Sequence, residues 1–315
     1  MYERIIVPIA GRRPEGEAYG LGYATLIARR TGANVELVHV HRPQWTTDPV
    51  ESVTPYRFEQ LVPWNRAYER AAVTAESVAL TEIADRIADR SGVTVATNVL
   101  YGPVAATIGD HAAQRGADLI VVGVDRSTES HRAWAGSVPD ALVRLATVPV
   151  LLVPAWTAAA VEEEEPKLRR ILLPLDGSDL SRQILVPVRR LARALEAEVS
   201  LVRVVPPATA GARDAARETA GTASAELRAV ARELEGHGIA TTARVIAHEE
   251  PARGILEETT SGDIDLIAMA THGRSGLKRF VLGSCAEAVL RSATAPVLMY
   301  RPDAPRAEPG GGGVL

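Results

Sequence analysis

Short hydrophobic runs recur along the chain, and each run is closed by proline, glycine or a polar residue. Runs of this length that are apolar throughout favour β-strands buried on both faces. They occur at residues 4–8, 34–40, 117–124, 148–154, 170–174, 198–205, 265–271 and 295–301. Helical stretches lie between them, for example at residues 18–31 and 179–195. This alternation of strands and helices predicts parallel sheets with helices on both faces and right-handed crossovers.

The second half of the chain repeats the first half at a constant spacing. Asp118 and Asp265 are 147 positions apart, and so are Gly136 and Gly283. Self-similarity at one fixed offset in a chain of 315 residues predicts two similar domains in tandem. The predicted fold class is therefore α/β, with two repeats that each form a five-stranded parallel sheet with helices on both faces.

The repeat also suggests where the domains begin and end. We expect a first domain at 1–154, a linker at 155–167, a second domain at 168–302 and a disordered tail at 303–315. The first strands of the two halves are 166 positions apart, since Pro174 corresponds to Pro8, so the first half carries 19 additional residues. We place this insertion at residues 43–66, where it is either a functional flap or surface decoration.

The amino-acid composition is typical of a globular protein and argues against some functions. Hydrophobic residues make up 46% of the chain, enough for each half to bury a core, and the formal net charge is −4. This balance argues against a nucleic-acid-binding protein, which would carry a basic stripe. The N-terminus has no signal-peptide pattern, and no apolar run is long enough to span a bilayer. We therefore expect a cytoplasmic protein that contacts neither nucleic acid nor membrane.

A glycine-rich loop follows the fourth strand of the second half. Gly273 is separated by nine residues from Gly283, which is followed at once by Ser284 and the last helix. Glycines let backbone N–H groups approach a phosphate closely, and a helix N-terminus attracts anions. Ser284 can cap the helix or donate its hydroxyl to a phosphate oxygen. The alternative is an ordinary strand-to-helix turn with a serine cap.

These motifs together resemble the universal stress protein family. In the sequence Leu173–Ser178, Asp176 follows the first strand of the second half, at the sheet edge where the loop also begins. The family signature is G-x-x-G, nine residues, then G and Ser or Thr; the second half departs from it at Ala270, where the family has glycine. The resemblance implies a binding site for ATP, with Mg²⁺ or Mn²⁺ held by the phosphates. The implied site residues are Asp176, Val204, Ala270, Gly273, Gly283 and Ser284.

The first half departs from the family pattern at two further positions. Ala10 stands where the aspartate is expected, and Arg126 stands where the second half has Gly273. The first change removes a carboxylate that would contact the nucleoside, and the second places a bulky side chain in the phosphate space. Although Gly123 and Ser137 are retained, we expect this half to hold no nucleotide.

Other residues offer less specific chemistry. Cys285, the only cysteine, is either a redox-sensing thiol activated by the helix N-terminus or a small residue packed under the helix. His272 is either a nucleotide contact or a plain loop residue, and His39 and His41 share one strand face without a third metal ligand. No general base is aimed at the loop, so binding is favoured over catalysis. The alternatives are a slow ATPase and a nucleotide-independent scaffold.

The closing strands of the halves suggest how the chain assembles. Residues 148–154 and 295–301 are apolar and are expected at sheet edges, where exposed backbone groups invite pairing. Universal stress proteins commonly dimerise through this strand. We therefore predict that the two halves pair with each other as an internal pseudo-dimer, and that two chains associate as a homodimer.

Overall fold

The computed structural model describes residues 2–10, 14–42, 58–124, 137–154, 166–209, 213–271 and 282–301. The elements of the first half are β1 Arg4–Pro8, α1 Pro14–Thr31, β2 Asn34–His41, α2 Phe58–Ser91, β3 Val95–Tyr101, α3 Val104–Gln114, β4 Leu119–Val124, α4 Val138–Leu145 and β5 Val150–Pro154. Those of the second half are β6 Arg170–Pro174, α5 Asp179–Arg182, α6 Leu185–Leu195, β7 Glu198–Val205, α7 Arg213–Glu235, β8 Thr241–Ala247, α8 Pro251–Ser261, β9 Leu266–Ala270, α9 Ser284–Ser292 and β10 Val297–Tyr300.

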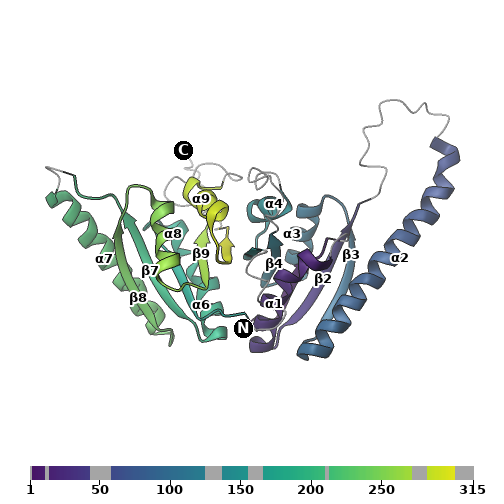
Figure 1. Cartoon of the computed structure of the whole chain (residues 1–315), viewed down its shortest axis with the longest axis horizontal. Helices are drawn as coiled ribbons and strands as arrows, with labels where there is room; N and C mark the ends of the chain where they lie inside the picture. Colours follow the sequence, from purple (N-terminus) through teal and green to yellow (C-terminus); the bar gives the residue numbers. More distant parts are fainter. Residues whose placement is uncertain are drawn as a thin grey trace, which may run out of the picture.

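The strands form one continuous ten-stranded sheet in the order β3-β2-β1-β4-β5-β10-β9-β6-β7-β8 (Figure 1). Each half contributes five strands that are parallel to their neighbours, which confirms the predicted α/β class and the two repeats. The two halves join where β5 pairs antiparallel with β10. The prediction that the closing strands of one chain pair with each other is therefore confirmed.

The register of this junction is two-fold symmetric. Leu151 pairs with Leu298, and these two leucines are 147 positions apart, the constant spacing of the repeat. On either side, Val150 pairs with Met299 and Leu152 with Val297, so each strand meets its own copy in the reverse direction. An isologous contact of this kind is the arrangement expected of a two-fold dimer, here formed within one chain.

Helices cover both faces of the sheet because successive strand residues point to opposite sides. On one face, Ile5 of β1 belongs to a core that also includes residues of α1, α2, α6 and α7. On the other face, Ile6 belongs to a core with residues of α3, α4, α8 and α9. Both cores draw residues from the two halves, so the hydrophobic interior continues across the junction.

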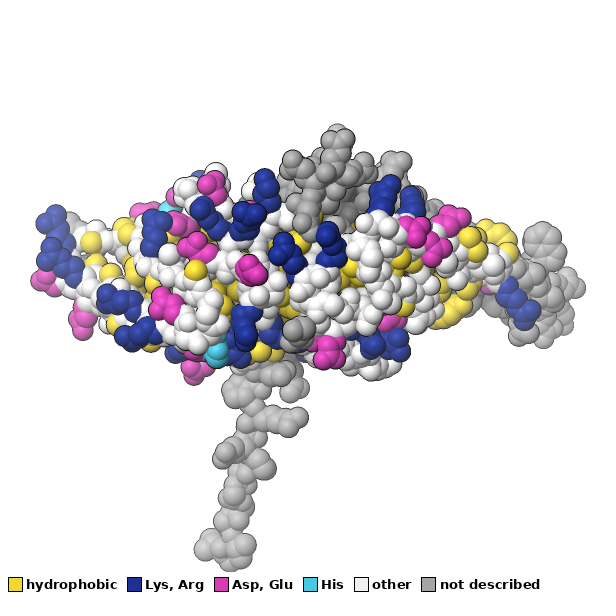
Figure 2. Space-filling model, turned by 90° about the horizontal axis from the view of Figure 1, so that it is seen from below, with side chains coloured by type: hydrophobic (Ala, Val, Ile, Leu, Met, Phe, Trp, Pro, Cys, Tyr) yellow, Lys and Arg dark blue, Asp and Glu magenta, His cyan; other side chains and the backbone are white. Residues whose placement is uncertain are grey.

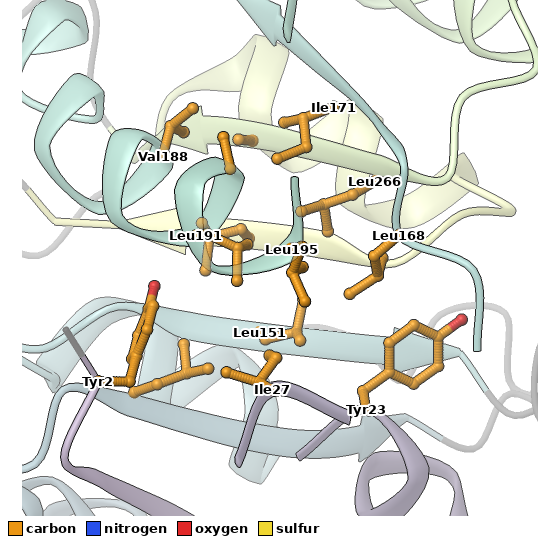
Figure 3. Packing of buried hydrophobic residues seen from close by; sticks show 14 of the residues in the cluster. Tyr2, Tyr23, Ile27, Leu151, Leu168, Ile171, Val188, Leu191, Leu195 and Leu266 are labelled. Carbon is orange, nitrogen blue, oxygen red and sulfur yellow. The ribbon is translucent and has the colours of Figure 1, made fainter. Parts of the chain in front are cut away.

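The first of these cores joins the halves through helix packing. Helices α1 and α6 are in contact across the junction. In Figure 3, Leu191 and Leu195 of α6 lie above Ile27 of α1 and Leu151 of β5. All four side chains are buried, and Leu151 and Leu191 have no exposed surface. Burial of a leucine contributes about 1.5–3 kcal/mol, so this contact adds substantially to the strand pairing.

A charged bridge spans the same junction. Asp118 follows α3, and its Oδ2 atom accepts hydrogen bonds from the backbone N–H groups of Glu3, at 2.6 Å, and Arg4, at 3.1 Å. Its Oδ1 atom accepts a hydrogen bond of 2.6 Å from Arg190 of α6, whose guanidinium also lies 5.1 Å from the centre of the Tyr2 ring. Burial raises the pKa of Asp118, but these hydrogen bonds and the Arg190 charge outweigh it and lower the pKa overall.

One expectation about the helices needs correction. The helix predicted at 179–195 is divided into α5 and α6. Pro187 explains the break, because proline has no N–H to donate and its ring disfavours a continuous helix over the preceding turn. The insertion predicted at 43–66 is partly an extension of α2, which has 34 residues where α7 has 23; residues 43–57 lie outside the described part of the chain.

The surface shows no dominant charge on the face seen in Figure 2, where basic and acidic side chains are interspersed. Over the part of the chain that the structure describes, no helix combines the length and the apolar character needed to cross a bilayer.

The repeat supplies a matched test of the charged bridge. Asp265 corresponds to Asp118, and its Oδ2 atom also accepts two backbone N–H groups, those of Arg169 and Arg170. Asp118→Asn can keep its two backbone bonds but must aim an amide N–H₂ at Arg190. We expect it to lower the free energy of unfolding by about 1 kcal/mol more than Asp265→Asn, a modest value because Arg190 is partly exposed.

Urea denaturation of the two variants and the wild type measures this difference. Equal losses for Asp118→Asn and Asp265→Asn would show that Arg190 does not stabilise the junction.

Candidate functional site

A cavity of about 690 Å³ lies at the carboxyl ends of the second-half strands. Strands β6 and β9 are neighbours there although they are not consecutive, and the crevice beyond such a switch point is where open α/β sheets bind ligands. The volume is typical of small-molecule sites. The cavity is lined by residues of β6, β7, β9, α7, α8 and α9, among them Asp176, Arg203, Val204, Ala270, Thr271, Gly283, Ser284 and Cys285.

The turn after β6 carries Asp176 into this cavity. Ser178 donates two hydrogen bonds to Asp176 Oδ1, from its backbone N–H at 2.9 Å and from its hydroxyl at 2.7 Å. The Ser178 hydroxyl in turn accepts the N–H of Ser181 and caps α5. Gly177 has a φ of +86°, a conformation that glycine adopts readily. The carboxylate is thus held in place by a local turn and is half-buried.

Arg203 of β7 lies beneath this turn, and the sequence analysis missed it. Its side chain is buried, its Nε donates to the Leu175 carbonyl, and its Nη2 donates to Glu226 of α7 at 2.9 Å. A Cβ atom on Gly177 would come within 2.8 Å of the guanidinium nitrogens, so glycine is required for the turn to pass over the arginine. An arginine inside the apolar run of Glu198–Val205 was the available signal, since buried charges need partners.

The N-terminus of α9 forms the opposite wall of the cavity. Gly283 is the N-cap residue, its N–H donates to the Thr271 carbonyl at 2.9 Å, and a Cβ there would lie 3.3 Å from the same oxygen. Ser284 is the first helical residue and is exposed. Of the two roles considered for Ser284, the helix cap is excluded here, because Gly283 takes the N-cap position. The partial positive charge of the helix end and the Ser284 hydroxyl both border the cavity.

Cys285 lines the same cavity as Asp176. Burial raises the pKa of its thiol, and the negative charge of Asp176 raises it further. The thiolate is the reactive form of cysteine, so a raised pKa does not favour the redox alternative. The thiol packs instead against the core shared by α8 and α9, as the second alternative held.

The other predicted site residues fall in two groups. Val204 lines the cavity from β7, and Ala270 lines it as the last residue of β9. Ala270 lies in a strand and is not among the described residues with positive φ, so its methyl group needs no special backbone conformation. Gly273 and His272 lie outside the described residues, as does Arg126 of the first half.

The corresponding edge of the first half differs in its details. Ala10 is exposed at the position equivalent to Asp176. Ser137, the equivalent of Ser284, is the N-cap of α4, and its hydroxyl accepts the N–H of Asp140 at 3.2 Å. The same serine therefore caps its helix in one half and borders the cavity in the other.

A protein-held metal centre is not evident where side chains are described. In that part of the chain, no group of three or more His, Cys, Asp or Glu residues is placed to hold a metal ion.

Comparisons with known proteins agree with the repeat. A model of the universal stress protein family matches residues 1–154 and 167–301. A universal stress protein of Mycolicibacterium smegmatis is 28% identical over 278 residues, covering 86% of this chain and 88% of that protein. One from Methanocaldococcus jannaschii is 31% identical over 149 residues, covering 45% of this chain and 86% of the relative.

Solved structures share the architecture along almost the whole chain. A universal stress protein from Archaeoglobus fulgidus has a TM-score of 0.63 at 15% identity, covering 95% of this chain and 96% of its own. A functionally unknown protein from Pseudomonas aeruginosa PAO1 has a TM-score of 0.65 at 20% identity, covering 96% and 93%. At these identities the likeness shows a common fold.

The thiol offers a direct test of the geometry of the site. We expect Asp176→Asn to lower the pKa of Cys285 and to speed its alkylation by iodoacetamide severalfold at mildly alkaline pH, because a nearby negative charge is removed. Burial persists in the variant, so the pKa should stay above its ordinary value. Asp179→Asn, on the exposed residue that begins α5, is the matched control.

Alkylation rates measured against pH report this single thiol without interference. An identical rate profile in wild type and Asp176→Asn would contradict the proximity of the two cavity walls.

Proposed function

Since the chain belongs to the universal stress protein family, we propose that its second half binds ATP and that the bound nucleotide switches conformation or partner choice. One observation carries the proposal: Asp176 and the N-terminus of α9 face a single cavity of about 690 Å³. The proposal includes the division of the chain into domains at 1–154 and 168–302, with ATP in the second.

The phosphate end of the nucleotide fits the α9 wall. Unpaired backbone N–H groups of the first helical turn and the helix dipole stabilise an anion there. Gly283 brings the backbone close without a side chain, and the exposed Ser284 hydroxyl can donate to a phosphate oxygen. In the proposal, Gly273 provides the same kind of close backbone approach on the other side of the phosphates.

The nucleoside end fits the opposite part of the cavity. The Asp176 carboxylate accepts hydrogen bonds, so it is suited to the ribose hydroxyl groups. The backbone of Val204 and the apolar side chains of Pro206, Pro251 and Ile255 provide a surface for a base. Arg203 fixes the turn that carries Asp176, through the Leu175 carbonyl.

A divalent cation fits this arrangement as part of the ligand. Mg²⁺ commonly binds phosphate oxygens and retains several waters, so it needs few protein ligands. We propose that Mg²⁺ or Mn²⁺ arrives with ATP and that its phosphates supply most of the coordination. The cation then neutralises the charge that faces the α9 N-terminus.

The residues near the α9 wall favour binding of ATP over its efficient hydrolysis. The thiol of Cys285 has a raised pKa and is a poor base at neutral pH. The Asp176 carboxylate already accepts two hydrogen bonds from Ser178. A nucleotide that remains intact can act by favouring one conformation over another.

Titration calorimetry with MgATP tests the proposal. We expect one site per chain, and Asp176→Ala should weaken binding by about 1–3 kcal/mol, roughly 5- to 150-fold in Kd, because a hydrogen-bond acceptor is removed. Asp179→Ala, at the exposed start of α5, should bind as wild type does. Two equal sites per chain would contradict the asymmetry between the halves.

The loop glycine gives a second test. We expect Gly273→Arg, which copies Arg126 of the first half, to abolish ATP binding while the thermal unfolding midpoint stays close to that of wild type. A folded variant with wild-type affinity would show that this loop does not contact the phosphates.

A further inference from the structure

In each half, a side chain of the second strand contacts the backbone carbonyl that follows the first strand. We call this contact the tether; its side chain differs between the halves. Strand register aligns Pro8 with Val38 in the first half and Pro174 with Val202 in the second, so His39 is the counterpart of Arg203. Each of these two side chains bonds the carbonyl that follows its first strand. The His39 Nδ1 atom lies 2.7 Å from the Ile9 carbonyl, and Arg203 donates to the Leu175 carbonyl.

Both tethers continue to the long helix that covers the strand. His39 Nε2 lies 3.5 Å from a carboxylate oxygen of Glu76 on α2, and Arg203 Nη2 lies 2.9 Å from Glu226 on α7. The first half therefore has a titratable histidine where the second half has a permanent cation.

The first half adds a second histidine to this cluster. The Nδ1 atom of His41 lies 2.8 Å from Glu76 Oε2, and its Nε2 atom lies 2.5 Å from Glu69 Oε2. The His41 side chain is only 4% exposed. Ionised carboxylates only accept hydrogen bonds, so with both glutamates ionised each ring nitrogen donates a proton and the ring is an imidazolium.

The surroundings of His41 are defined on each packed element. Strand β2 contributes His39, and α2 contributes Glu69 and Glu76, which are seven positions apart on one helix face. From β3, the Tyr101 ring meets His41 edge-on at a centroid distance of 5.8 Å. These are the titratable and charged groups that the described residues place against the ring.

The cluster holds a part of α2 that the core does not hold. Within residues 68–79 no side chain is fully buried, and Tyr68 and Val78 are 50% and 53% exposed. From Tyr68 onward, where the structure describes the side chains of α2, the first buried one is Leu80. In Figure 1, α2 runs along the outer side of β3 and extends beyond the end of that strand.

The corresponding part of α7 is anchored differently. Ala223 and Leu227, on either side of Glu226, are 3% and 1% exposed and belong to the core. Apolar packing therefore holds α7 on the sheet around Glu226, independently of the charge of neighbouring residues.

We propose that His41, Glu69 and Glu76 form a pH-sensitive clamp, which holds residues 68–79 of α2 on the sheet while His41 is protonated and releases them when it is not. The Arg203–Glu226 pair is the pH-independent counterpart in the second half. This regulation belongs to the first half and does not depend on nucleotide binding.

The direction of the switch follows from the balance of charges. Burial lowers the pKa of His41, but hydrogen bonds and charges from Glu69 and Glu76 outweigh it and raise the pKa overall. The stabilisation is therefore complete below the unfolded-state pKa of about 6.5 and is lost as pH rises through the raised folded-state value. After deprotonation one carboxylate loses its donor, and the helix segment can turn outward to solvate it.

Hydrogen exchange of the full-length wild-type chain tests the clamp. Exchange is followed by mass spectrometry from about pH 6 to about pH 8.5, a range that spans the ordinary histidine pKa, with correction for the intrinsic pH dependence of exchange. We expect protection of residues 68–79 to fall severalfold over this range, because the clamp is lost as His41 deprotonates. Protection of residues 213–226 in α7 should stay constant, as the internal control.

Two variants separate the clamp from general destabilisation. In His41→Gln the protection of residues 68–79 should no longer change with pH. In Glu69→Gln, which removes one carboxylate from a partly exposed helix position, the midpoint should shift to lower pH. The chemical shifts of the His41 ring protons, followed by NMR as a function of pH, measure the same midpoint. This measurement needs no substitution that could impair folding.

If the protection of residues 68–79 in the wild type did not change with pH, the proposal would be overturned. The same holds if folded His41→Gln kept the wild-type pH dependence. An NMR midpoint at or below that of an ordinary histidine would also overturn it.

Discussion

The antiparallel pairing of β5 with β10 joins the sheets of the two halves into one continuous sheet. Without it, each sheet would end in an apolar strand with unpaired backbone groups, which invites association with other chains. Pairing Leu151 with its own copy Leu298 removes both edges at once and buries both side chains completely. The cores on the two faces then continue through the junction, and the bridge from Arg190 to Asp118 reinforces it.

The candidate site depends on this framework because its parts come from distant segments. Strand order brings the end of β6 beside the end of β9, so Asp176 and the α9 N-terminus share one cavity although more than a hundred residues separate them. Because the two walls are close, the Asp176 charge adds to burial in raising the pKa of Cys285. Arg203 then ties the Asp176 turn to α7 through Glu226, so the cavity wall and the covering helix are linked.

The two halves share one scaffold but differ in particular side chains. Their strands, register and edge aspartates Asp118 and Asp265 remain equivalent. The side chain that tethers the second strand to its helix is His39 in one half and Arg203 in the other. The same backbone geometry is thus compatible with a histidine at this position in the first half and with a permanent cation in the second.

The sequence by itself determined the α/β class and the two repeats, because apolar runs and a constant spacing can be read directly from one chain. The pairing of the closing strands followed from their apolar character together with the resemblance to the family. It also indicated Asp176 and Gly283, which line the cavity. Only the tertiary structure decided that Gly283 rather than Ser284 caps α9, and that Arg203 lies under the Asp176 turn. Such roles depend on which groups from distant strands and helices approach within hydrogen-bond distance, and sequence spacing does not encode that distance.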